Sequence, residues 1–189
     1  MRHNAGWKPA VRGFTDTAQS CYTICMQHAG WRSRGYIPHC DGAGIVQHVT
    51  ISTIGAPEGI EQNFGLKLFE APEAAAAVEG TLLHFDGERY RLLAWCVMPN
   101  HAHIIVEQIQ DWPLASIVHS WKSFSANTVN RILGRRGPVW MREYFDRFMR
   151  TDEQFISTVK YIEMNPVAAK LVNEPSEWRW SSARWRLEA

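Results

Sequence analysis

Residues 98–107 read Met-Pro-Asn-His-Ala-His-Ile-Ile-Val-Glu, and this stretch decides the predicted fold. The apolar run of residues 92–97 before it has the length and composition of a strand. The Pro-Asn pair is turn chemistry, so the segment predicts a hairpin whose return strand begins with His101 and His103. Residues i and i+2 of a strand face the same side, so the two imidazoles lie side by side, as a metal ion requires of two rigid ligands. Taken alone, such a pair is more often two polar residues beside a turn.

A second segment, residues 151–166, predicts an amphipathic helix. Thr151 and the glutamine three residues later form a capping box, and apolar residues follow at helical spacing. Pro166 disfavours helical geometry at the preceding residue, so the helix is expected to end at Asn165. Tyr161 then lies in the last turn, where its hydroxyl can project beyond the packed face. A tyrosine near a helix end is usually amphipathic packing, so its spacing alone does not make it a nucleophile.

The length of 189 residues with 46% hydrophobic residues suits one compact domain with a sizeable core. The four cysteines form no Cys-x-x-Cys pair, so we expect reduced thiols rather than a structural zinc site. No apolar run reaches membrane-spanning length and no signal pattern opens the chain, which leads us to expect a cytoplasmic protein without membrane partners. Residues 1–32 carry no motif and are expected to be a poorly ordered extension of a domain at 33–189.

The charge is distributed unevenly although the net charge is only +1. Residues 37–114 hold three Lys or Arg against ten Asp or Glu, whereas residues 115–189 hold twelve against eight. Seven of those twelve bases fall within residues 115–150, against two acids. A basic second half is the footprint expected of a protein that binds a phosphate backbone, although a solvated helix face would look similar.

The remaining periodicity predicts an α+β fold. Strands are expected at 45–52, 90–97 and 101–107, and helices at 66–83 and 114–133. This order favours an antiparallel sheet with helices on one face, compatible with a ferredoxin-like topology. His48 starts a His-Val-Thr triplet that fits one motif of two-histidine phosphoesterases. The second such triplet is missing from the sequence, so we interpret His48 as an ordinary strand residue.

The segments Met98–Val106 and Tyr161–Val172 together resemble the REP-associated tyrosine transposases, a branch of the single-tyrosine HUH nucleases. Three further stretches match the same family in the expected order: Arg34–His39, Val139–Arg147 and Trp178–Arg184. The likeness covers residues 33 to 186. It implies the HUH nuclease fold, in which a central strand carries the two histidines and a later helix places a tyrosine beside them.

The resemblance also implies the roles of individual residues. His101 and His103 would bind a divalent cation, Mg²⁺ or Mn²⁺, and Tyr161 would attack a phosphodiester of single-stranded DNA to form a 5′-phosphotyrosine link. The polar residue four positions after the tyrosine, Asn165, would be the third metal ligand. An asparagine before a proline is also a common helix C-cap, and Glu163 and Glu107 are alternative ligands.

The expected substrate is single-stranded or hairpin DNA, bound by a monomer or a homodimer. Candidate DNA-binding residues are chosen by charge and position: Lys122, Arg131, Arg135, Arg136 and Arg142 for phosphates, and an exposed Trp140 for stacking on bases. Two other functions remain open. A non-catalytic relative would grip hairpins without needing Tyr161 or the histidines, and a metal-dependent hydrolase would use water and form no covalent intermediate.

Overall fold

The computed structural model describes residues 32–33, 38–39, 42–55, 65–109 and 112–186. The predicted N-terminal extension therefore lies outside the described residues, apart from Arg32. Two short strands, β1 (Arg32–Ser33) and β2 (Pro38–His39), pair with each other. The main sheet has four antiparallel strands in the order β4-β5-β3-β6: β3 (Val46–Ser52), β4 (Tyr90–Met98), β5 (His101–Gln108) and β6 (Phe145–Phe148).

The helices connect and cover these strands. They are η1 (Leu68–Glu70), α2 (Pro72–Leu83), α3 (Leu114–Ile132), α4 (Asp152–Ala168), η2 (Pro175–Glu177) and α5 (Ala183–Arg186). The succession β3-α2-β4-β5-α3-β6 is the split βαβ pattern of a ferredoxin-like fold, as the sequence predicted. Among the described helices, none is long and apolar enough to cross a membrane.

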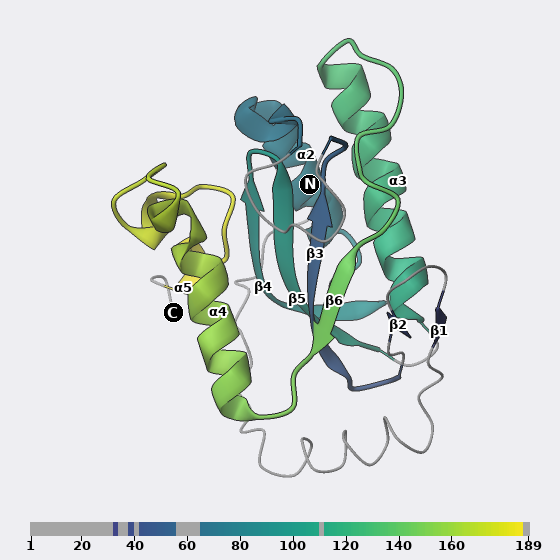
Figure 1. Cartoon of the computed structure of the whole chain (residues 1–189), viewed down its shortest axis with the longest axis vertical. Helices are drawn as coiled ribbons and strands as arrows, with labels where there is room; N and C mark the ends of the chain where they lie inside the picture. The colour runs from purple at the N-terminus through teal and green to yellow at the C-terminus, as the bar shows by residue number, and fades with distance from the viewer. Residues whose placement is uncertain (1–31, 34–37, 40–41, 56–64, 110–111, 187–189) are drawn as a thin grey trace.

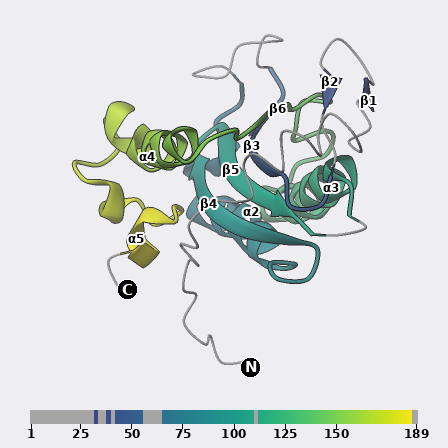
Figure 2. The same ribbon diagram turned by 90° about the horizontal axis from the view of Figure 1, so that it is seen from below.

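The helices cover both faces of the sheet. Figure 2 shows α2 and α3 on one side and α4 on the other. The predicted arrangement with all helices on one face is therefore wrong for α4. Helices α2 and α3 each connect two strands of the sheet, whereas α4 follows the last strand and is free to pack on the opposite face. We call these the α2/α3 face and the α4 face of the sheet.

The two faces follow from strict alternation along the strands. On β5, Ala102, Ile104 and Val106 join the large core under α2 and α3, whereas Ile105 joins a smaller core under α4. On β4 the alternation is interrupted by a bulge between Leu92 and Ala94. Leu92 and Trp95 face the large core, while Leu93 and Ala94 both face the small one.

Helix α4 begins where the sequence predicted and extends further than predicted. The Thr151 hydroxyl accepts a hydrogen bond from the Gln154 amide at 3.2 Å, which confirms the cap. The predicted end at Asn165 is wrong, because Pro166 lies inside the helix and α4 continues to Ala168. Both Asn165 and Pro166 are buried, so packing outweighs the conformational preference of the residue before proline.

Candidate active site

The histidine pair lies at the start of β5 on the α4 face. The ring centroids of His101 and His103 are 4.8 Å apart at an interplanar angle of 83°, and both side chains are buried. The same-face placement predicted from their spacing is present in the structure. The tight turn at Pro99-Asn100 sets where β5 begins, and therefore which residues of the strand reach this face.

Each histidine directs one ring nitrogen to a protein partner and leaves the other without one. His101 Nδ1 lies 2.7 Å from Asn100 Oδ1, and because a carboxamide oxygen only accepts, this nitrogen donates. Nε2 of His101 and Nε2 of His103 are both buried without a hydrogen-bond partner among the described residues. A buried polar atom without a partner costs about 1–3 kcal/mol, and a bound cation would remove that cost.

His48 belongs to this cluster, although its sequence context indicates only an ordinary strand residue. Its Nε2 lies 3.1 Å from Nδ1 of His103, and Thr50 Oγ1 lies 3.1 Å from the same Nδ1 and 3.4 Å from His48 Nε2. The register of β3 against β5 creates this cluster by placing Thr50 opposite His103. The His-Val-Thr triplet was visible in the sequence, but its partner strand was not, and only the pairing register reveals that it supports the second histidine.

All three imidazoles are neutral at pH 7. Burial lowers the pKa of His101 from 6.5 to about 4, and burial together with the nearby Arg147 guanidinium lowers the pKa of His48 to about 4. Burial, followed by the charges of His101 and His48, holds the pKa of His103 well below its usual value. A neutral imidazole keeps the lone pair that a metal ion needs.

Tyr161 lies over this cluster from α4. Its ring centroid is 5.5 Å from that of His103 and 6.3 Å from that of His48, and the side chain is 40% exposed. Ile162, the next residue, packs into the small core beneath α4. The helix is thus fixed by its apolar residues while the tyrosine lies at the border between the buried histidines and solvent.

Asn165 follows one helical turn after Tyr161 and is buried. It lines a cavity of about 200 Å³ together with His101, Asn100 and Lys67. The structure therefore brings Asn165 and His101 to the same cavity. The alternative interpretation as a helix C-cap is wrong, since the cap residue is Ala169.

The two glutamates considered as alternative ligands are engaged elsewhere. Glu163 accepts hydrogen bonds from Ser182 Oγ at 2.8 Å and from Arg186 Nε at 2.6 Å. Glu107 forms an ion pair with Arg91 at 3.0 Å, near the far end of β5. In the described part of the chain, no three His, Cys, Asp or Glu side chains are grouped to hold a metal ion, so the candidate set is two imidazoles and one amide.

Of the six predicted DNA-binding residues, Trp140 is not exposed as expected, and Lys122 and Arg135 are hydrogen-bonded to main-chain carbonyls. Trp140 is buried and donates from Nε1 to Ser125 Oγ at 2.9 Å. Lys122 donates from Nζ to the carbonyls of residues 141, 142 and 143 at 3.0–3.1 Å, and burial lowers its pKa to about 8. Arg135 is half-buried and bonds to the carbonyl of Pro138 at 3.2 Å. These side chains hold the α3–β6 connection in place, a role that charge and position in the sequence could not distinguish from phosphate binding.

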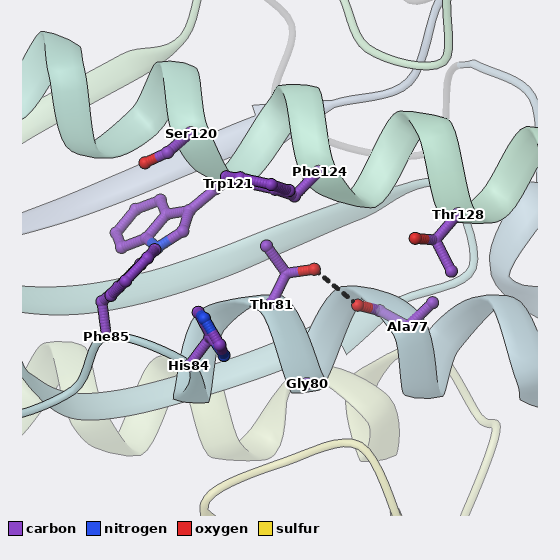
Figure 3. Close-up of a pocket in the computed structure, with 9 residues that line it drawn as sticks. All are labelled: Ala77, Gly80, Thr81, His84, Phe85, Ser120, Trp121, Phe124 and Thr128. Atoms are coloured by element: carbon purple, nitrogen blue, oxygen red, sulfur yellow. Dashed lines mark hydrogen bonds between the residues drawn. The ribbon is translucent and has the colours of Figure 1, made fainter.

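The other three predicted contacts, Arg131, Arg136 and Arg142, are exposed and stay predictions. A separate cavity of about 340 Å³ lies between α2 and α3, on the face of the sheet opposite the histidines. Figure 3 shows His84, Phe85 and Phe124 around it, with Thr81 bonded back to the carbonyl of Ala77 at 2.7 Å. It has no part in the histidine–tyrosine cluster.

Comparison with known proteins finds one family model and solved structures that resemble this chain. Residues 84–165 match the family model described as "Transposase IS200 like". A comparison with curated proteins gave no match. Among solved structures, a REP-associated tyrosine transposase bound to a REP hairpin is 20% identical with a TM-score of 0.58, covering 80% of this chain and 81% of that chain. A transposase candidate from Deinococcus radiodurans is 16% identical with a TM-score of 0.43, covering 70% of this chain and 95% of that one.

An antiparallel α+β sheet that presents paired histidines to a tyrosine on a following helix defines the class. The matched segment runs from the residue after α2 through β4, β5, α3 and β6 to Asn165 in α4, and so contains His101, His103 and Tyr161. Residues 84–165 are similar to the IS200-like transposase family, in agreement with the resemblance found in the sequence. The structural likeness confirms the α+β fold. His48 and Thr50 lie outside the matched segment.

Proposed function

We propose that this protein is a metal-dependent transposase that nicks single-stranded DNA and transfers the strand through a covalent link to Tyr161. The observation that carries the proposal is the approach of the Tyr161 ring to 5.5 Å from His103, whose Nε2 is buried without a partner. A half-exposed hydroxyl beside converging lone pairs suits a phosphodiester held between them. The family match supports DNA processing in general, and the geometry supports this particular chemistry.

The residues present fit a divalent cation. His101 and His103 would hold it through Nε2, and the amide oxygen of Asn165 would be the third ligand, which suits Mg²⁺ or Mn²⁺. When bound, the cation would withdraw charge from the scissile phosphate and stabilise the leaving oxygen. The turn at Asn100 orients His101, and Thr50 and His48 orient His103, so both nitrogens are held in place before any ion arrives.

Tyr161 supplies the nucleophile. Its oxygen forms a bond to phosphorus while the bond from phosphorus to the 3′ oxygen breaks, and the tyrosine proton is balanced by the proton gained by the 3′ hydroxyl. The products are a 5′-phosphotyrosine and a free 3′ hydroxyl. The phosphodiester bond energy is conserved, so attack by another 3′ hydroxyl rejoins strands without a nucleotide cofactor.

The substrate we propose is DNA that combines a hairpin with an unpaired flank, bound by a monomer or a homodimer. The solved REP-associated relative is bound to a REP hairpin, and the basic segment 115–150 of this chain retains exposed arginines at 131, 136 and 142. Charge neutralisation by such residues predicts affinity that falls as salt rises.

The test is denaturing electrophoresis of an end-labelled hairpin oligonucleotide after incubation with Mn²⁺. Wild type should form a covalent protein–DNA band carrying the label on the 3′ side of the nick, and Tyr161→Phe should form none while retaining DNA affinity. Tyr144→Phe, a second tyrosine outside α4, is the matched control and should behave as wild type. Cleavage without an adduct would identify water as the nucleophile, and binding without cleavage would identify a non-catalytic hairpin binder.

A further inference from the structure

Two side chains of β6 share the face of the sheet that carries the histidine cluster. In the antiparallel pairing of β3 with β6, Phe145 lies opposite Thr50 and Arg147 lies opposite His48. Directly opposed residues of an antiparallel pair project to the same side of the sheet. Thr50 and His48 both contact His103, so Phe145 and Arg147 extend the candidate active site along β6.

These two side chains are exposed where the rest of this face is covered. The small core beneath α4 takes its strand residues chiefly from β4 and includes Ile105 of β5 and Val46 at the start of β3. Phe145 is 38% exposed and Arg147 is exposed, whereas the intervening Asp146 faces the other side of the sheet. β6 is the edge strand beside β3, and Figure 1 shows it on the side of the sheet away from β4, the strand nearest α4. No described helix covers this part of the face.

An exposed phenylalanine and an arginine two residues apart on an uncovered strand can together bind a nucleotide. An aromatic ring on a sheet surface stacks on a base of any sequence, but only if the base is unpaired and its face accessible. A guanidinium beside it binds the phosphate of the same or the next nucleotide. The register places Arg147 opposite His48, so this charge lies on the histidine side of the sheet.

We propose that β6 is the binding strand for the unpaired flank of the DNA, with Phe145 stacked on a base and Arg147 on a phosphate next to the one that Tyr161 attacks. The inference rests on the proposed function, since it assigns the path of the same substrate. It differs from the predicted contacts on α3 and on the loop after it, because this pair lies on the face that carries the histidines.

The experiment measures binding without chemistry, in full-length protein carrying Tyr161→Phe and in metal-free buffer. The probes are a hairpin oligonucleotide with an unpaired flank that contains 2-aminopurine, and the same hairpin without the flank. Phe145→Leu keeps an apolar side chain and removes the ring, and Phe145→Trp keeps a ring. The controls are Phe124→Leu, an exposed phenylalanine on α3, and Arg91→Gln, an exposed arginine at the start of β4.

Phe145→Leu should weaken binding of the flanked hairpin by roughly 5- to 100-fold, abolish the stacking-induced quenching of 2-aminopurine and leave binding of the blunt hairpin unchanged. Phe145→Trp should restore both signals. Arg147→Gln should weaken binding and reduce the slope of log affinity against log salt by about one. The two controls should match the parent protein, and thermal unfolding of every variant establishes that it is folded.

Equal affinity of Phe145→Leu and Phe124→Leu for the flanked hairpin would overturn the proposal, as would an equal loss of affinity for both hairpins. Neither result bears on nicking, which the covalent adduct of wild type tests separately. Conversely, flank binding that depends on Phe145 in a protein that forms no adduct would sustain this inference and remove the nicking function.

Discussion

The two faces of the sheet are built from the same strands and serve opposite purposes. On the α2/α3 face, alternate residues of β3, β4 and β5 form one continuous apolar core with Trp95, Trp121 and Tyr90. On the α4 face, the residues between them form a smaller core that gives way to three histidines, a threonine and a half-exposed tyrosine. Neighbouring residues of one strand therefore serve different roles: one packs in the large core and stabilises the fold, and the next faces the candidate active site.

The largest effect should come from truncating neighbours on opposite faces. Ile104→Ala leaves a cavity in the large core and should reduce the free energy of unfolding by about 2–5 kcal/mol. His103→Ala, one residue earlier, also leaves a cavity and removes the contacts of Thr50 and His48 with Nδ1. It relieves the cost of about 1–3 kcal/mol of a buried Nε2 without a partner, so its loss of stability should be smaller than that of Ile104→Ala. Urea unfolding followed by circular dichroism measures both, and equal losses would break the comparison.

A pH titration of stability should isolate the histidine face. Burial lowers the pKa of His101 from 6.5 to about 4, so between these values the unfolded chain binds more protons than the folded one. The free energy of unfolding of the metal-free protein should therefore be fully present above pH 6.5 and fall as the pH drops toward 4. At about 1.4 kcal/mol per tenfold change in proton affinity, His101 alone contributes on the order of 3 kcal/mol.

His101→Gln should reduce this acid-induced loss in urea unfolding curves recorded at several pH values, while His48 and His103 maintain the remainder. His119→Gln, an exposed histidine of α3, is the control and should keep the dependence of wild type. If both variants lose stability with acid as wild type does, His101 is not buried in its neutral form.

The smallest effect concerns the support of His103. Thr50→Val removes the hydroxyl 3.1 Å from His103 Nδ1 while keeping the shape of the side chain. Groups that orient a metal-binding imidazole typically contribute 10- to 100-fold in metal affinity, and since His48 Nε2 still contacts the same nitrogen we expect about tenfold. Calorimetric titration with Mn²⁺ measures it, and Thr50→Ser should bind as wild type. A Thr50→Val protein with unaltered Mn²⁺ affinity would show that His103 needs no hydroxyl beside it.

Local chemistry was enough to predict most of the elements. The capping residue Thr151, the turn before His101 and the apolar periodicity gave the strands, the helices and the histidine pair. The end of α4 was predicted wrongly, because the burial of Asn165 and Pro166 is a tertiary effect that the preference of a residue before proline does not include.

What depends on strand register or on packing could not be predicted. His48 contacts His103 only because β3 and β5 pair with Thr50 opposite His103. The sequences of the two strands do not determine this register. Lys122 and Trp140 are residue types typical of a nucleic-acid surface, but Lys122 donates to carbonyls of the α3–β6 connection, and Trp140 is buried and donates to Ser125. Phe145 and Arg147 lie inside a stretch that matched the family, yet only the pairing of β6 shows which face they occupy.

The bulge in β4 has a consequence for which changes in length the chain can accept. Leu93 is the extra residue: without it, Leu92, Ala94 and Trp95 would still alternate between the two faces. Loss of one residue here leaves every later side chain in its place, and costs chiefly the carbonyl that accepts a hydrogen bond from Arg186 at 3.1 Å. Loss of one residue between Trp95 and Met98 would instead exchange the indole of Trp95, which donates to Glu79, with a side chain of the α4 face. Relatives that differ in strand length by one residue are therefore expected to differ at Leu93.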